Sequence, residues 1–346
     1  MKMGRFAAAF AAALLLSSTG FAAAGKIVTA SERIASGTPG IELYLREKHP
    51  AGMTHFAPNR ILLFVHGATY PAETSFDLPL DGVSTMDWLA ARGFDVWLVD
   101  IRGYGLSTRP PEMDQPPEAN PPLVDTAMAA HDVGMAVDHI LEKRHVPKLD
   151  VMGWSWGTSI MGLYTSTHDD KVNRLVLYAP QWIVNPLPPA PTDTLGAYRT
   201  VTRGAAKQRW LTGVAPDQQA ALIPPGWFDQ WADATFATDP VGAKQNPPVL
   251  RATNGVTQDS RSYWRAGKPL YDPAKITVPV LIIHAEWDAD LPSYQAQGYF
   301  AALTQTPWKR FVEIGQGTHT VIMEKNRMQL FDGVADFLEE KDPLKK

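Results

Sequence analysis

One serine lies between two glycines in Gly153-Trp154-Ser155-Trp156-Gly157. The apolar run 149–152 precedes this segment and a helical pattern over 156–166 follows it, so the order is strand, sharp turn, helix. Glycine suits both flanking positions because the strand and the helix pass too close together for Cβ atoms. Taken alone, the pentapeptide also fits an ordinary glycine- and serine-containing loop. In its strand-to-helix context we interpret Ser155 as a nucleophile held at the tip of the turn.

A serine hydroxyl needs a neighbouring base to take its proton when it attacks at neutral pH. Nine histidines are candidates. His319 lies in the glycine-bearing loop 315–319, directly after the strand expected at 310–314, and loops at the carboxyl ends of parallel strands are where such sheets present catalytic groups. We therefore select His319 as the general base. Helical or surface positions account for the six others considered: His49, His55, His131, His139, His145 and His168.

The imidazole in turn needs a carboxylate that fixes its tautomer and stabilises the imidazolium. Asp288 follows the apolar strand expected at 280–283 and precedes His319 by 31 residues. Glu286 and Asp290 in the same loop are rival candidates. Asp288 is our choice, and the chain order is then serine, acid, histidine.

The segment His66-Gly67-Ala68-Thr69-Tyr70 directly follows the strand expected at 61–65. We expect the backbone N–H groups of Ala68 and Trp156 to form an oxyanion hole. The hydroxyls of Thr69 and Tyr70 could supplement it. His66 is expected to hold the loop by hydrogen bonds and not to exchange protons. A plain turn after a strand is the alternative for this segment.

Short β-branched runs alternate with longer helical patterns along the chain, which indicates βαβ crossovers and a mostly parallel sheet covered by helices on both faces. The expected strands are 41–46, 61–65, 95–99, 149–152, 174–178, 280–283 and 310–314. The expected helices are 84–91, with Ser84 as N-cap, 124–144, 156–166, 293–303 and 324–340.

Residues 181–277 interrupt this alternation. They contain 12 of the 29 prolines and five tryptophans, and no buried-strand pattern is evident among them. We interpret this stretch as a helical and looped insertion on the sheet and not as a separately folding domain.

The amino terminus has the features of a secretory signal peptide: Lys2 and Arg5, an apolar run of 11 residues, and small residues up to Ala24. That run is too short for a membrane span of ~20 residues. We expect cleavage near Ala24, no stable membrane anchor afterwards, a periplasmic or secreted location, and a single domain over 25–346.

Composition excludes several classes of function. The chain has 346 residues and no cysteine, so disulfides, zinc–thiolate sites and thiol nucleophiles are ruled out. Its net charge of −4, without a basic block, argues against nucleic acid as a partner. No metal-binding or P-loop motif appears, and we expect no metal or organic cofactor.

Five ordered segments resemble the α/β-hydrolase fold family, in its esterase-like branch: 66–67, 100–107, 153–157, 286–292 and 317–319. The resemblance spans about 40–340 and implies a cap after the sixth family strand, where 181–277 lies. It also implies Ser155 as nucleophile, Asp288 as acid and His319 as base. Ser155 stands where dehalogenases and epoxide hydrolases of this fold carry aspartate, so those reactions are disfavoured.

The resulting hypothesis is a serine hydrolase that cleaves a carboxylic ester or lactone through an acyl-enzyme. Tyr70, Trp154 and Trp182 are the candidate substrate-binding side chains, and the many tryptophans suggest an apolar pocket for a small or medium hydrophobic substrate. The alternative, expected for the majority of the tryptophans, is that they pack the insertion onto the sheet. The same triad could cleave an amide, a thioester or a C–C bond. A non-catalytic binding protein is the alternative outside enzymes.

Overall fold

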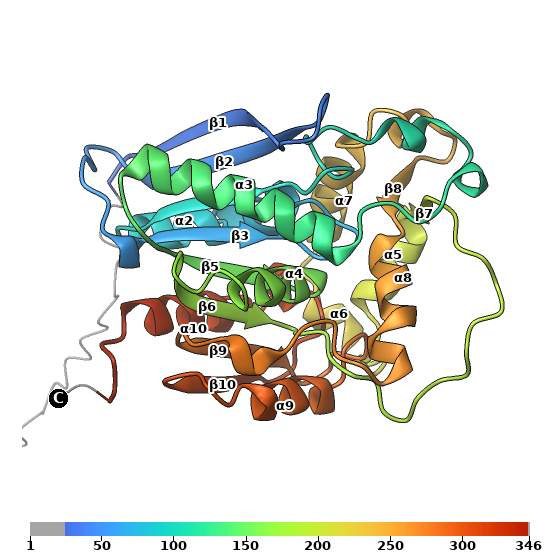
Figure 1. Cartoon of the computed structure of the whole chain (residues 1–346). Helices are drawn as coiled ribbons and strands as arrows, with labels where there is room; N and C mark the ends of the chain where they lie inside the picture. The colour runs from blue at the N-terminus through green and yellow to red at the C-terminus, as the bar shows by residue number, and fades with distance from the viewer. Residues whose placement is uncertain (1–24, 345–346) are drawn as a thin grey trace, which may run out of the picture.

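The computed structural model describes residues 25–344 and is built on one eight-stranded sheet (Figure 1). The predicted signal peptide, residues 1–24, lies outside the described residues. The strand order is β1-β2-β4-β3-β5-β6-β9-β10, and all strands from β4 to β10 in that order run parallel, whereas β1 and β2 are antiparallel. The strands are β1 (Ile27–Ala35), β2 (Glu42–Pro50), β3 (Ile61–Val65), β4 (Asp95–Val99), β5 (Leu149–Trp154), β6 (Val172–Tyr178), β9 (Val280–Ala285) and β10 (Lys309–Ile314).

Helices cover both faces of this sheet, and the sheet lies between two hydrophobic cores. One core packs α1 (Ala72–Phe76), α2 (Thr85–Ala91) and α10 (Met328–Glu339) on one face. The other packs α3 (Thr126–Arg144), α4 (Trp156–Thr165) and α9 (Ser293–Ala302) on the opposite face. The central strands are buried throughout, as expected for strands covered on both sides. Within 25–344, no helix combines the length and apolar character needed to cross a membrane.

Between β6 and β9 the chain leaves the sheet and forms an additional group of elements at one end of it (Figure 1). These are β7 (Tyr198–Thr202), α5 (Arg203–Trp210), α6 (Gln219–Leu222), α7 (Trp227–Ala237), β8 (Val249–Thr253) and α8 (Gly255–Ser262). Trp210, Phe228 and Trp231 contact one another and join the core on the face of α1, so this inserted segment is packed onto the sheet domain.

Three strands, β1, β7 and β8, were not expected from the sequence. β8 is fully buried and pairs antiparallel with β7 inside the inserted segment, where no buried strand was expected. The five residues of β8 directly follow Pro247 and Pro248, a dipeptide typical of a loop, so the short apolar run was not recognised as a strand. β1 was also missed, because it is a polar edge strand that pairs only with β2.

The expected helices are present, with one boundary shifted. Ser84 caps α2 as predicted, accepting a hydrogen bond from the Asp87 N–H at 3.0 Å. The helix expected at 324–340 begins only at Met328, because Val321–Met323 forms a separate short turn and the buried Glu324 is turned toward the loop that carries His319.

Candidate active site

Ser155 lies at the sharp turn between β5 and α4. Its backbone has φ 56° and ψ −120°, a conformation that costs about 1–3 kcal/mol in a residue other than glycine. The Ser155 N–H donates to the Tyr178 carbonyl at 2.9 Å and so fixes the turn to the end of β6. This turn places the Ser155 hydroxyl at the carboxyl end of the sheet.

The flanking glycines are required by close packing. A Cβ on Gly153 would lie 2.1 Å from the Gly157 carbonyl oxygen, and a Cβ on Gly157 would lie 2.6 Å from that of Val65. A Cβ on Gly67 would approach the Ser155 Cβ to 3.0 Å. The β3 loop, the end of β5 and the start of α4 therefore meet around Ser155 as backbone against backbone.

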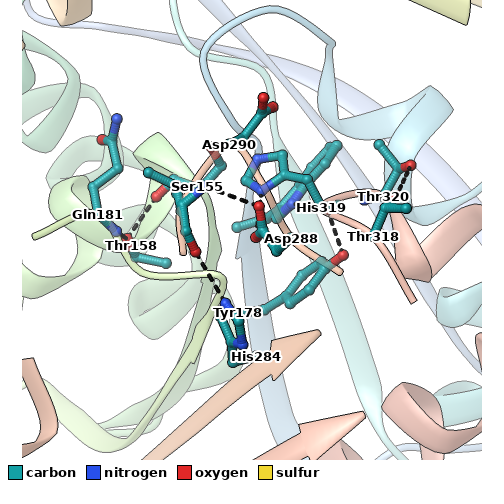
Figure 2. A network of polar contacts seen from close by, with 12 residues as sticks. Ser155, Thr158, Tyr178, Gln181, His284, Asp288, Asp290, Thr318, His319 and Thr320 are labelled. Carbon is teal, nitrogen blue, oxygen red and sulfur yellow. Dashed lines mark hydrogen bonds and ion pairs between the residues drawn. The ribbon is translucent and has the colours of Figure 1, made fainter. Parts of the chain in front are cut away.

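Asp288 and His319 are brought together from the loops after β9 and β10 (Figure 2). His319 Nδ1 lies 2.8 Å from Asp288 Oδ2, and both residues are buried. Because a carboxylate only accepts, Nδ1 carries the proton and Nε2 keeps its lone pair. Among the described residues, Nε2 is buried and has no hydrogen-bond partner. This imidazole is held in the tautomer that a general base needs.

The backbone of His319 is fixed by two aromatic side chains. Tyr178 Oη donates to the His319 carbonyl at 2.6 Å, and Trp154 Nε1 donates to the same oxygen at 3.0 Å. Trp154 directly precedes Ser155, so one residue links the serine turn to the histidine loop. Its indole is buried and stacks on Tyr178. Trp154 thus contributes to positioning, and it does not line the cavities at Ser155.

Glu324, which the sequence analysis did not single out, holds the loop that carries His319 by hydrogen bonds. Its carboxylate accepts from the Thr318 N–H at 3.0 Å, from the Thr318 hydroxyl, and from the Thr320 hydroxyl at 2.9 Å (Figure 2 shows both threonines). Burial raises the pKa of Glu324 to about 7, against the opposing effect of these donors. The residues on either side of His319 are therefore held by one buried carboxyl group.

The two rival carboxylates contact other groups. Glu286 Oε2 accepts from the Gln316 N–H at 2.8 Å. Asp290 Oδ2 pairs with Arg209 Nε at 2.6 Å. Burial alone would raise the pKa of Asp290, but His319 and Arg209 together hold it below its ordinary value. Of the three candidates, Asp288 is the one hydrogen-bonded to His319.

The loop after β3 contains the predicted oxyanion-hole residue Ala68, and Trp156 is the first residue of α4. First-turn N–H groups of a helix have no acceptor within the helix, so the Trp156 N–H is available to an oxygen at Ser155. His66 is structural, as predicted: Nδ1 donates to the Gly67 carbonyl at 2.7 Å and Nε2 accepts from the Ile101 N–H at 3.1 Å. Burial lowers its pKa to about 4, so it stays neutral.

The hydroxyls of Thr69 and Tyr70, which could supplement the oxyanion hole, lie in different surroundings. The Thr69 hydroxyl accepts from Arg199 at 3.0 Å and from Arg209 at 3.3 Å. Tyr70 is buried, lies edge-on to Trp231 and is not among the residues that line the cavities at Ser155. Tyr70 is therefore a core residue and not a substrate-binding one.

A cavity of about 260 Å³ lies at Ser155 and adjoins a second cavity of about 460 Å³, with which it shares five lining residues. Ser155, Trp182 and Trp264 line the smaller one, so Trp182 lies where the sequence placed it. Most tryptophans of the inserted segment pack into the core or onto its surface, so the aromatic part of the lining is limited to Trp182 and Trp264. The residues that line both cavities are mainly polar: Ala68, Gln181, Arg209, Ser260 and Arg265.

Comparison with known proteins agrees with this architecture. The family model of the alpha/beta hydrolase fold matches residues 60–326. The chain belongs to the α/β-hydrolase fold family. Membership of this family supports the prediction that the protein is a hydrolase. No curated protein matches the chain significantly in sequence.

Solved structures share the fold of this α/β-hydrolase at low sequence identity. A serine hydrolase involved in carbazole degradation (CarC) is 16% identical with a TM-score of 0.62, covering 90% of this chain and 99% of its own. A thermophilic esterase from Thermogutta terrifontis is 16% identical with a TM-score of 0.56, covering 89% and 98%. The enol-lactonase from Burkholderia xenovorans LB400 is 15% identical with a TM-score of 0.56, covering 89% and 100%. Identities this low establish the fold alone.

Proposed function

We propose that this α/β-hydrolase is a serine hydrolase that cleaves a carboxylic ester or lactone through an acyl-enzyme. The observation that carries the proposal is the Asp288–His319 hydrogen bond, which leaves a buried, unpartnered Nε2 on the histidine. A strained serine at the tip of a β5–α4 turn supplies the nucleophile. These groups supply the serine, acid and histidine of an acyl-transfer enzyme, and Ser155 Oγ and His319 Nε2 are not hydrogen-bonded to each other in the substrate-free protein.

In the first half of the reaction, Ser155 Oγ attacks the substrate carbonyl carbon while His319 Nε2 takes the hydroxyl proton. The N–H groups of Ala68 and Trp156 stabilise the tetrahedral oxyanion, because both belong to backbone that is closely packed around Ser155. His319 then gives its proton to the leaving alkoxide oxygen, and the C–O bond breaks. The products are the alcohol and an ester between Ser155 and the acyl group.

In the second half, water attacks the acyl carbon and His319 Nε2 takes its proton. The tetrahedral intermediate collapses, His319 returns the proton to Ser155 Oγ, and the acid leaves. Asp288 keeps Nδ1 protonated and stabilises the imidazolium in both halves. Tyr178 and Trp154 hold the histidine backbone in place during both proton transfers.

The cavity dimensions favour a small or medium substrate over a polymer. The two adjoining cavities lie within the range typical of small-molecule sites, ~300–1,000 Å³ together. The proposed location is the periplasm or the medium, after removal of residues 1–24. The partner is then a small-molecule ester or lactone that reaches the enzyme outside the cytoplasm.

A panel of substrates tests the type of bond that is cleaved. Matched 4-nitrophenyl ester, δ-lactone, 4-nitroanilide and thioester substrates with the same acyl chain are compared by kcat/KM. The proposal expects the ester and lactone to be favoured, and Ser155→Ala to abolish turnover of both. A higher kcat/KM for the anilide or the thioester would replace the ester assignment, and turnover retained in Ser155→Ala would refute the nucleophile.

A further inference from the structure

The cavities beside Ser155 are positively charged although the protein as a whole is not. The charged side chains that line them are four arginines and two aspartates, a net charge of +2: Arg199, Arg209, Arg261, Arg265, Asp193 and Asp290. The whole chain has a net charge of −4. The positive charge is therefore a local property of the site. All four arginines come from the inserted segment.

Two of the arginines are neutralised by partners. Arg209 Nε pairs with Asp290 at 2.6 Å, and Arg261 pairs with Asp193 at 2.8 Å. Burial alone would lower the pKa of Arg209, but the Asp290 carboxylate keeps it above its ordinary value. Asp290 and Asp193 are the two negatively charged residues of the lining, and each is paired with an arginine.

The other two arginines have no acidic partner. Both Nη groups of Arg199 are engaged by neutral acceptors: Nη1 donates to the Thr253 carbonyl and the Asn254 side chain, and Nη2 to the Ala68 carbonyl at 2.6 Å and the Thr69 hydroxyl at 3.0 Å. Burial lowers the pKa of Arg199, and repulsion from Arg209 adds to this effect. Within residues 25–344, Arg265 forms no ion pair and no side-chain hydrogen bond, and it lines both cavities.

Two buried arginines elsewhere in the fold have acidic partners. Arg102 is bound by the buried Asp132, and Arg251 by the buried Asp239. Each of these guanidiniums has its counter-charge within the protein, as buried charges generally do. Arg199 departs from that pattern, because it is half-buried and has only neutral acceptors. Arg265 is exposed and lines the cavity that contains Ser155, so its donors are open to a ligand there.

We propose that Arg265 binds an anionic group of the substrate, with the positive charge of Arg199 adding to the attraction, so that the preferred ester or lactone carries a carboxylate. The inference rests on the proposed function and names its substrate class. The planar guanidinium forms two parallel hydrogen bonds to a carboxylate or a phosphate, and this chemistry is common to both anions. Arg265 and Ala68 line the same cavities, so the anion lies close to the loop that would hold the reacting oxygen.

The first test compares two esters that differ only at the end of the acyl chain. 4-Nitrophenyl pentanoate ends in a methyl group, and the 4-nitrophenyl half-ester of glutaric acid ends in a carboxylate. The wild-type enzyme should favour the half-ester in kcat/KM by about tenfold or more, as expected for one charge-assisted contact. Arg265→Gln should reduce this ratio by about tenfold.

Arg203→Gln is the matched control. Arg203 lies in the same inserted segment, pairs with the exposed Asp229 and Asp233, and does not line either cavity at Ser155. The substrate ratio should stay at the wild-type value in this variant. A wild-type ratio of one or less, or an equal fall in Arg203→Gln and Arg265→Gln, would overturn the inference while leaving the ester hydrolase intact.

A binding measurement separates this inference from the catalytic proposal. Glutarate and inorganic phosphate are titrated calorimetrically into the Ser155→Ala protein and into the same protein with Arg265→Gln added. Glutarate should bind the first protein at least tenfold more tightly than the second. Tighter binding of phosphate than of glutarate would identify a phosphate as the anion and overturn the carboxylate assignment, and equal glutarate binding by both proteins would overturn the anion site.

Discussion

Gly157→Ala should damage both stability and catalysis, because this glycine is where α4 touches the strand that leads to the oxyanion loop. The added Cβ would lie 2.6 Å from the Val65 carbonyl oxygen and 2.8 Å from that of His66. Both oxygens belong to backbone at the end of β3, which cannot rotate aside as a side chain would. The helix or the loop must therefore move.

The expected size of the effect follows from these contacts. Forcing extra volume into a packed site costs typically 1–3 kcal/mol of stability. The displaced backbone leads into Ala68, so the oxyanion donor shifts with it, and a misplacement on the order of 1 Å costs about 10²-fold in rate. We expect kcat/KM for a simple ester to fall about 10²-fold and the free energy of unfolding to fall by about 1–3 kcal/mol.

Gly204→Ala provides the control for this variant. Gly204 is exposed in the first turn of α5, and a Cβ there would meet no atom within 4 Å. The same substitution should therefore leave the rate unchanged and raise stability by about 0.4–1 kcal/mol. Urea unfolding and ester kinetics are measured for both variants. Unchanged values for both quantities in Gly157→Ala would refute the close-packing explanation of the turn.

Three further predictions concern the groups around His319. Asp288→Asn should lower kcat by about 10⁴-fold with little change in folding, because the amide no longer holds Nδ1 protonated, and a loss below tenfold would contradict the pairing. Tyr178→Phe removes the 2.6 Å hydrogen bond to the His319 carbonyl and should cost about 1 kcal/mol in urea unfolding, together with a measurable fall in kcat. Glu324 has a pKa of about 7 when folded and an ordinary value of 4.5, so the folded protein holds the extra proton and loses stability as pH rises between these values. Glu324→Gln should remove about 2–3 kcal/mol of the stability difference between about pH 5 and about pH 8, and an unchanged pH profile would contradict this account.

The central strands and the serine turn were predictable because their signals are local. Continuous apolar runs mark β3 and β4 to the residue, and the glycines of 153–157 mark the point of closest packing. The position of Asp288 after β9 followed from the same logic, since carboxyl ends of parallel strands meet at one edge of the sheet. The contact between Asp288 and His319 follows because the strands that precede them, β9 and β10, are parallel neighbours in the sheet.

The remaining parts of the site depend on contacts distant in sequence. No sequence motif singled out Arg199 or Arg265, and their place in the two adjoining cavities arises from how the inserted segment packs over the sheet. Tyr70 and Trp154 read as pocket residues because they adjoin catalytic positions, yet both point into the core. Glu324 read as the start of a helix, although its carboxyl group is turned back to Thr318.

The central claim is that His319, held by Asp288, activates Ser155. Covalent labelling by a fluorophosphonate, measured by intact mass and peptide mapping, tests it most directly. One label for each wild-type chain is predicted, located on Ser155, with a labelling rate that falls by orders of magnitude in His319→Ala and to zero in Ser155→Ala. Labelling at another residue, or an equal rate in His319→Ala, would contradict the account.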